Sequence, residues 1–249
     1  MGPLVVERIS GVALLRISRP EKRNALTLAM LTELVDLVGE EISAGALAVI
    51  LAGDDEVFSA GVDLSALGNG IDDVHVDDLL ATAIAQVRAT PVPIVAAIEG
   101  PCIGGAVELV LACDARVAAE GSFFAVPATQ LGLLYRPEGI ASLVAHVGRD
   151  TVSRLLLFNE RLGSSEALRA GLATHTCVRG AAVEMAFALC EGISRATPTA
   201  VSATKELICE LLSDDSDLSH WSARRETLLA SDERREALAH ATQRRKKGD

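Results

Sequence analysis

The sequence has too little positive charge to balance its acidic side chains. Its 249 residues include 23 Lys and Arg against 34 Asp and Glu, which gives a formal net charge of -11. A surface of that sign repels a phosphate backbone, so we expect no nucleic-acid partner. The one dense basic run, residues 244–247, is interpreted as a solvated tail.

The sequence also lacks the residue spacing of a metal site. Its five cysteines stand in apolar surroundings without a CxxC pair, and no histidine cluster accompanies them. They are interpreted as buried thiols in a reducing compartment. Asp72, Asp73, Asp77 and Asp78 do not have the spacing of a calcium loop and are interpreted as solvated surface. We therefore expect no bound metal.

No apolar run is long enough to cross a membrane, because charged residues interrupt every candidate. No signal peptide is recognised in the sequence, so we expect a cytoplasmic protein with no membrane partner. A chain of this length can bury a full core as one α/β domain. We expect a core domain over residues 1–190 and a helical region over residues 191–249.

The stretch 91–132 has the clearest organisation in the sequence. Residues 94–98 are a short β-branched and alanine run between breakers, which predicts a strand buried on both faces. Gly104 and Gly105 then let the backbone turn and approach a ligand closely. Residues 106–112 predict an apolar helix whose first N–H groups face that turn, an arrangement that binds anionic groups.

Glu108 is the unusual residue of this predicted helix. It lies one helical turn after Gly104, and the surrounding sequence AVELVLAC offers no polar face. A charge there is unfavourable unless a site or a partner needs it, so we expect the carboxylate to face the bound group. The alternative is a glutamate that points to solvent or pairs with a neighbouring arginine. Residues 58–64, FSAGVDL, follow another predicted strand and are a second source of donor amides.

Strands and helices alternate through the first half of the sequence, which indicates a mainly parallel sheet covered by helices. The expected strands there are residues 4–7, 12–17 and 46–52, and the expected helices follow a Thr27 N-cap and cover residues 79–89. Residues 68–78, rich in Gly, Asn and Asp, predict a mobile segment over the mouth of the site.

Helices dominate the second half of the sequence. The predicted elements there are a helix over 137–147, another from about residue 150, a short helix capped by Ser164 or Ser165, a strand over 176–178, and three helices after residue 181. The last helices carry more apolar surface than one exposed layer hides, so we expect subunit contacts.

Four segments together resemble the crotonase, or enoyl-CoA hydratase/isomerase, superfamily over nearly the whole chain. They are RPEKRNALT (19–27), FSAGVDL (58–64), IEGPCIGGAVELVLACDARVAAE (98–120) and NERLGSSEALRAGL (159–172). The resemblance implies an α/β fold, a crotonase-like stack of ββα units (the ClpP/crotonase-type spiral) with a C-terminal helical region that trimerises. It implies a homotrimer, or a hexamer that is a dimer of trimers.

The resemblance also implies a site for an acyl-CoA thioester. The amides of Val62 and Gly105 correspond to the oxyanion hole of the family, and Glu108 to its first catalytic glutamate. Coenzyme A enters as part of the substrate, with no permanently bound cofactor. The residues that the resemblance places beside it are Lys22, Arg23, Ala25, Ala60, Val62, Asp63, Leu64 and Gly105. The residues themselves also allow Asp63 to be a helix cap.

One departure from the family pattern concerns the second glutamate that its hydratases carry in an F-x-x-P-E segment. Here that segment ends in Ala128. Glu138, near the start of the next helix, is a candidate stand-in, or a first-turn glutamate favoured by the helix dipole. Our named activity is enoyl-CoA hydratase. The alternatives are an enoyl-CoA isomerase, thioester hydrolysis or decarboxylation, and a weakly active acyl-CoA-binding protein.

Overall fold

The computed structural model describes residues 2–66, 74–211 and 218–247. Within these residues, the main sheet has the strand order β1-β2-β3-β4-β6-β9. Its strands are β1 (Leu4–Ile9), β2 (Val12–Ile17), β3 (Ala48–Ala52), β4 (Ile94–Ile98), β6 (Ala115–Ala119) and β9 (His175–Cys177). The first pair is antiparallel and the other pairs are parallel, as the alternation of strands and helices predicts.

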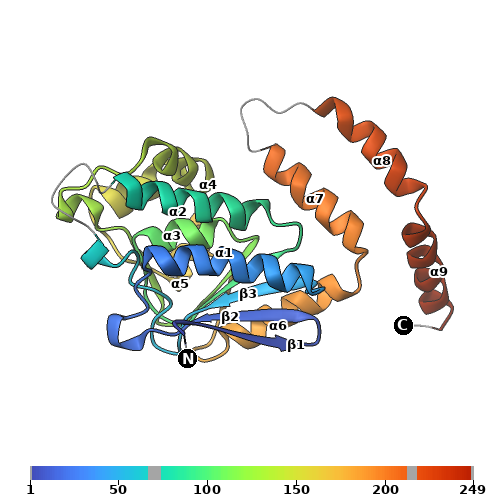
Figure 1. Ribbon diagram of the computed structural model, residues 1–249, viewed down its shortest axis with the longest axis horizontal. Helices are drawn as coiled ribbons and strands as arrows, with labels where there is room; N and C mark the ends of the chain where they lie inside the picture. Colours follow the sequence, from blue (N-terminus) through green and yellow to red (C-terminus); the bar gives the residue numbers. More distant parts are fainter. Residues whose placement is uncertain (1, 67–73, 212–217, 248–249) are drawn as a thin grey trace.

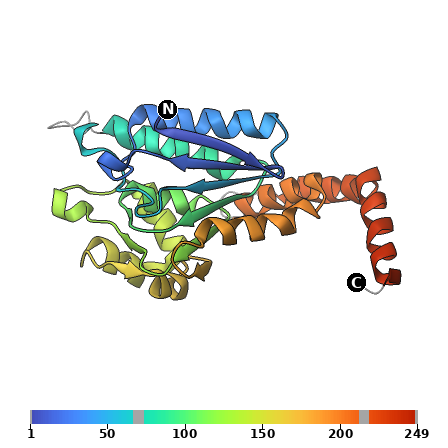
Figure 2. The same ribbon diagram turned by 90° about the horizontal axis from the view of Figure 1, so that it is seen from below.

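Helices cover both faces of this sheet (Figures 1 and 2). On one face lie α1 (Leu28–Ser43), α2 (Val74–Ala89) and α3 (Gly105–Leu111), and on the other lies α6 (Ala182–Ser194). Alternate strand residues point to opposite faces. In β2, for example, Leu15 packs in the larger cluster with α1, whereas Leu14 packs in the smaller cluster with α6.

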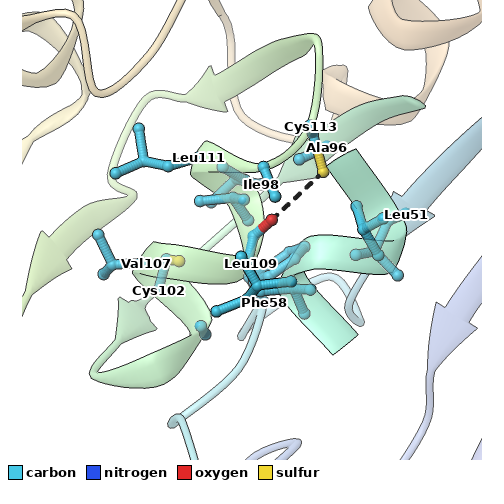
Figure 3. Packing of buried hydrophobic residues seen from close by; sticks show 14 of the residues in the cluster. Leu51, Phe58, Ala96, Ile98, Cys102, Val107, Leu109, Leu111 and Cys113 are labelled. Carbon is cyan, nitrogen blue, oxygen red and sulfur yellow. Dashed lines mark hydrogen bonds between the residues drawn. The ribbon is translucent and has the colours of Figure 1, made fainter. Parts of the chain in front are cut away.

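The short helix α3 is the most deeply buried helix in this arrangement. All seven of its residues are buried, and Figure 3 shows Val107, Leu109 and Leu111 among the side chains of neighbouring strands and loops. After the helix ends, the Cys113 thiol donates to the Leu109 carbonyl at 3.6 Å. A helix packed on every side fixes the position of any group that it carries.

A smaller sheet and further helices complete the body of the molecule. They are β5 (Cys102–Ile103), β7 (Phe123–Ala125), β8 (Leu162–Gly163), α4 (Pro137–Leu156) and α5 (Ser164–Ala170), with 3-10 turns η1 (Pro20–Lys22), η2 (Leu64–Ala66) and η4 (Ala128–Leu131). Gly148, with φ of 77°, interrupts α4 close to where the sequence predicts one helix to end and the next to begin. The helix α5 follows Gly163, so neither Ser164 nor Ser165 is its cap.

The last helices extend away from this body (Figures 1 and 2). They are α7 (Pro198–Glu210), α8 (Trp221–Leu229) and α9 (Asp232–Lys247), with the 3-10 turn η5 (Leu218–His220) before α8. Together with α6 they make four α-helices after residue 181 within the described residues, where the sequence predicts three. Helix α6 crosses the predicted boundary at residue 190, and the division into two regions stays a prediction.

Of two further predictions, the structure confirms one and shows the other to be wrong. Thr27 caps α1, because its hydroxyl accepts a hydrogen bond from the Met30 amide at 3.2 Å. Helix α2, in contrast, begins at Val74, so residues 74–78 are helical and do not belong to a loop. The rest of the predicted mobile segment, residues 68–73 with Asp72 and Asp73, lies outside the described residues. Among the described helices, none is long and apolar enough to traverse a lipid bilayer.

Candidate active site

Three loops meet at the carboxyl ends of the parallel strands β2, β3 and β4. Backbone hydrogen bonds join them: the Ala60 amide donates to the Arg23 carbonyl at 2.9 Å, and the Ile103 amide donates to the Ser59 carbonyl at 3.0 Å. In an open parallel sheet this edge is where ligands bind, because the loops there present unpaired backbone groups. The edge therefore holds the two glycine loops that the sequence singles out.

Glycine allows these loops to touch. Gly61 has φ of 91°, and a Cβ added to it would lie 2.6 Å from the Ile103 carbonyl oxygen. A Cβ added to Gly105 would meet Leu80 Cδ2 at 2.7 Å and Val62 Cγ2 at 3.3 Å. The backbone of Gly61 thus lies against that of Ile103, and the Val62 and Leu80 side chains lie against Gly105, approaches that a side chain at either glycine would disturb.

The amides of Val62 and Gly105 have no backbone acceptor within the described residues. Gly105 is the first residue of α3, so its N–H lies at the positive end of the helix and cannot bond within it. Both residues line the same cavity of about 330 Å³. Two N–H donors on one cavity wall form a binding place for an oxygen that carries negative charge.

The cavity is lined by four segments, residues 60–64, 76–80, 103–108 and 127–136, and most of the lining side chains are apolar. Beside Val62 and Gly105, its lining includes Ala60, Leu64, Leu80, Ile103, Ala128 and Leu131. The polar side chains among its described residues are Asp77, Glu108, Gln130, Tyr135 and Arg136. An apolar chain with a polar group at one end would fit such a lining.

Glu108 stands in the first turn of α3, and its side chain is 8% exposed. Its Oε2 accepts a hydrogen bond from Arg136 Nη2 at 3.1 Å. A Cβ on Gly139 would lie 2.7 Å from the same oxygen, so this glycine leaves room for the carboxylate. Burial raises the pKa of Glu108, whereas the positive charge of Arg136 opposes that rise and the negative charge of Asp77 adds to it. The group is a buried carboxylate with a raised proton affinity, suited to act as a base.

A family model described as enoyl-CoA hydratase/isomerase matches residues 7–246. The chain belongs to this family. It is 30% identical over 209 residues to 2,3-dehydroadipyl-CoA hydratase of Escherichia coli (strain K12), covering 84% of this chain and 82% of that protein. It is 32% identical over 207 residues to the mitochondrial Delta(3,5)-Delta(2,4)-dienoyl-CoA isomerase of Mus musculus, covering 76% and 63%.

A solved structure supports the fold of this family member. The crystal structure of enoyl-CoA hydratase from Bacillus anthracis superposes with a TM-score of 0.90 at 28% sequence identity, covering 98% of this chain and 97% of that chain. The predictions of the superfamily and of the crotonase-like fold are therefore confirmed.

Ala128 and Glu138, the two residues considered for the second carboxylate of the family, lie in different surroundings. Ala128 lines the cavity where a hydratase of the family would carry its second glutamate. Glu138 is exposed in the first turn of α4 and lines a smaller cavity of about 150 Å³, which it shares with Glu108 and Arg136. It is not among the described residues that line the main cavity. The structure thus brings Glu108 to the two amides, and leaves Glu138 outside.

The residues predicted to meet coenzyme A lie in two groups. Lys22 and Arg23 are exposed on the turn around η1, while Ala25 is buried behind them. The Asp63 carboxylate accepts hydrogen bonds from Ser65 at the start of η2 and from Arg19 at 2.6 Å. These hydrogen bonds hold the pKa of Asp63 well below its usual range. The Asp63 side chain therefore caps η2 and links its own loop to the loop of Arg19.

Four polar residues of the cavity were not among the predicted site residues: Asp77, Gln130, Tyr135 and Arg136. Tyr135 and Arg136 belong to the segment LYRPEG, where only Glu138 attracts attention by its spacing. Asp77, interpreted as solvated surface, is half-buried and lines the cavity. A helix beginning at Val74 could have been inferred from the apolar residues Val76 and Leu80, four positions apart, which put Asp77 on a partly buried face.

Proposed function

We propose that this crotonase-family acyl-CoA enzyme is an enoyl-CoA hydratase with Glu108 as its base. The observation that carries the proposal is the meeting of three groups in one cavity: the Glu108 carboxylate and the amides of Val62 and Gly105. The hydratases among its relatives and the family match support the substrate class, a 2-enoyl thioester of coenzyme A. The mostly apolar lining fits the acyl chain of such a substrate.

The two amides would act on the thioester carbonyl. When its oxygen lies between the N–H groups of Val62 and Gly105, negative charge that develops on that oxygen is stabilised by fixed donors in a site with little water. Attack on carbon 3 of the enoyl group produces this charge, because the electrons of the double bond move toward the carbonyl oxygen and give an enolate. The buried Glu108 carboxylate would take the proton from the attacking water and return it to carbon 2.

An isomerase is the second candidate, and Ala128 favours it. A site with one glutamate at this position can move a proton between two carbons of the same enolate without binding a water. A dienoyl-CoA isomerase is among the relatives, which supports the same alternative. Thioester hydrolysis, decarboxylation and simple acyl-CoA binding use the same oxyanion arrangement but have no observation of their own in this cavity.

A panel of thioesters tests the proposal. The purified protein is incubated separately with 2-enoyl-CoA and 3-enoyl-CoA thioesters of several chain lengths, and products are followed by mass and by chromatography. A hydratase adds the mass of one water to a 2-enoyl substrate, whereas an isomerase changes retention without a change of mass. If all thioesters are recovered intact, the enzyme proposal is wrong and a binding protein takes its place.

We further propose that the phosphates of coenzyme A bind near Lys22 and Arg23. Both side chains are exposed, and the Arg23 carbonyl accepts a hydrogen bond from Ala60, a residue of the cavity lining. Positive charge here would attract an anionic ligand in a chain of net charge -11. Arg23→Glu should weaken coenzyme A binding about tenfold or more at low salt in calorimetry. Arg149→Glu, an equal charge change on exposed α4, should leave the affinity unchanged; equal affinities for both variants would remove the assignment.

We also propose that residues 191–249 assemble the protein into a trimer or a hexamer in the cytoplasm. The projecting helices and the connections beside them carry exposed large apolar side chains, which a contact between subunits would remove from water. These are Ile208, Leu211, Leu218, Leu229 and Leu238. Light scattering at micromolar concentration should give the mass of three or six chains, and a monomer would rule the assembly out.

A further inference from the structure

The main cavity contains a second carboxylate that the proposed chemistry has not used. Among the described residues of the lining, Asp77 and Glu108 are the acidic ones. They come from different helices: Asp77 lies in the first turn of α2 and Glu108 in the first turn of α3. The two helices pack against each other on the same face of the main sheet, and both carboxylates line the one cavity.

The packing of α2 fixes where Asp77 stands. Leu80 lies one helical turn after Asp77, and residues three apart share a face of a helix. A Cβ on Gly105 would lie 2.7 Å from Leu80 Cδ2, so this face of α2 rests directly on the start of α3. Val76 and Leu80 on that face are buried and also line the cavity. The contact of Leu80 with Gly105 therefore fixes the helix turn that carries Asp77 against the start of α3, in the cavity that Gly105 also lines.

Charge effects across the cavity agree with this position. The negative charge of Asp77 raises the pKa of Glu108 and also that of Tyr135, although burial is the larger cause for each. These two groups lie on α3 and on the loop before α4. The positive charge of Arg136, from that same loop, acts against both increases. Asp77 is thus within electrostatic reach of the base in the same cavity.

We propose that Asp77 is the second carboxylate of the active site and holds the water that Glu108 deprotonates. The inference rests on the proposed hydratase function. In the step, one O–H of the water is hydrogen-bonded to Asp77 and the other to Glu108. The water oxygen bonds to carbon 3, its proton passes to Glu108, and the electron pair of the double bond moves to the thioester oxygen.

The second half of the step restores the enzyme. The electron pair that had moved to oxygen forms the thioester carbonyl again. The bond between carbon 1 and carbon 2 becomes a single bond as carbon 2 takes the proton from Glu108. Glu108 is a carboxylate again, and Asp77 neither gains nor loses a proton in the step. The overall change is the addition of one water across the double bond. Asp77 would thereby supply the second carboxylate that Ala128 cannot, from another element of the fold.

A pair of neighbouring variants tests this assignment. Asp77→Asn keeps the shape of the side chain but weakens its capacity to accept hydrogen bonds from water. Asp78→Asn is the matched control, because Asp78 is exposed on α2 and does not line the cavity. Each protein is assayed with the 2-enoyl-CoA that the wild type hydrates fastest. We expect Asp77→Asn to lower kcat about a hundredfold, in the range of misplacing a reacting group, and Asp78→Asn to stay within twofold of the wild type.

A second readout separates water binding from a merely structural role. With the saturated acyl-CoA of the same chain length in deuterated water, Glu108 exchanges the carbon 2 proton through an enolate, and no attacking water is needed. Asp77→Asn should keep this exchange within about threefold of the wild type, since the base and the two amides remain in place. Its retention also shows that the variant is folded.

The outcomes distinguish the two levels of the argument. Lost hydration with retained exchange supports Asp77 as the residue that holds the water. Near-normal hydration by Asp77→Asn overturns this assignment while the hydratase proposal stands. Loss of both hydration and exchange also overturns it, because Asp77 then acts through Glu108 or through the fold. If the wild type hydrates none of the thioesters, the proposed function fails and this inference fails with it.

Discussion

Helices α3 and α8 place their charges in opposite surroundings. All seven residues of α3 are buried and one of them, Glu108, is charged. None of the nine residues of α8 is buried, and three of them are charged. In α8 a charge such as Arg224, which pairs with Glu206 at 2.7 Å, stands in water and contributes little to stability. In α3 the charge is held in an apolar site where it is unfavourable for folding.

This difference between α3 and α8 gives a criterion for recognising a functional charge in this molecule. Arg136 Nη2 lies 3.1 Å from Glu108 Oε2 and reduces the free-energy cost of burying this carboxylate, but burial still raises the pKa of Glu108. A core position that served packing alone would be occupied by an apolar side chain at no such disadvantage. We propose that Glu108 is retained because a base is needed beside the two amides of the cavity.

Helix α7 lies between these extremes and has one buried charge of its own. Lys205 is buried, and its Nζ donates to Asp114 Oδ2 at 2.7 Å, to the Val92 carbonyl at 2.9 Å and to Thr90 Oγ1 at 2.9 Å. All three partners belong to the body of the molecule. This buried charge has a full set of partners and does not line the main cavity, so we interpret it as an anchor for the C-terminal helices.

A new charge introduced into each helix tests the difference in burial between α3 and α8. Val110→Asp puts a carboxylate with no partner among the side chains around α3 and should lower the free energy of unfolding by about 4 kcal/mol or more. Ala223→Asp also introduces a carboxylate, on the exposed surface of α8, and should alter the free energy of unfolding by less than about 1 kcal/mol. Urea unfolding followed by circular dichroism measures both. Similar losses for the two variants would show that burial does not distinguish these helices.

The anchor at Lys205 should give the next largest effect. Lys205→Met keeps the apolar stem but leaves the Val92 carbonyl and the Asp114 carboxylate without one donor. We expect a loss of about 1–3 kcal/mol in unfolding free energy. Limited proteolysis should then cut before α7 earlier than in the wild type. Lys22→Met, on the exposed turn, serves as the control for stability; if both variants unfold alike, α7 is held by other contacts.

Arg136 is expected to keep Glu108 ionised at neutral pH. In Arg136→Gln the carboxylate loses its positive partner, while burial and the charge of Asp77 still favour the protonated form, so the pKa of Glu108 rises further. The acidic limb of the pH profile of kcat/KM should move to higher pH, with the largest loss of activity at low pH and near recovery at high pH. Arg136→Lys should retain most of the activity. An unmoved profile would mean that Arg136 does not set the ionisation of the base.

The smallest expected effect is on stability, and it depends on pH. Because the folded-state pKa of Glu108 lies above its value of 4.5 in the unfolded chain, protonation favours the folded protein. The contribution is present in full below the unfolded value and is lost as pH rises through the folded one. Glu108→Gln lacks this dependence. Relative to the variant, the wild type should lose about 1.4 kcal/mol for each pH unit between the two pKa values, by unfolding at a series of pH values.

Local patterns in the sequence predict much of this fold. The strand over residues 94–98 and the buried helix after Gly105 follow from runs bounded by glycine and proline, and both elements are present as β4 and α3. The N-cap at Thr27 follows from local chemistry in the same way. Glu108 is conspicuous for a related reason, since a lone charge in an apolar helix can be seen without knowing the tertiary structure.

The rest of the site depends on packing that no local pattern contains. Asp77, Glu108 and Arg136 are far apart in sequence, and only the contact of α2 with α3 and the return of the chain before α4 bring them to one cavity. Asp77 is hidden further by the polar residues before it, which favour a loop. The boundary between α8 and α9 was missed as well, although Ser231 accepts a hydrogen bond from the Arg234 amide at 3.2 Å as a cap would.

The most direct test of the central claim is the turnover of Glu108→Gln. With the best 2-enoyl-CoA substrate, kcat should fall by about two orders of magnitude or more, as for loss of a general base, while thioester affinity by calorimetry changes less than about threefold because both amides remain. Glu138→Gln, outside the main cavity, is the comparison variant. If Glu108→Gln turns over the substrate at the wild-type rate, Glu108 is not the base and the account is wrong.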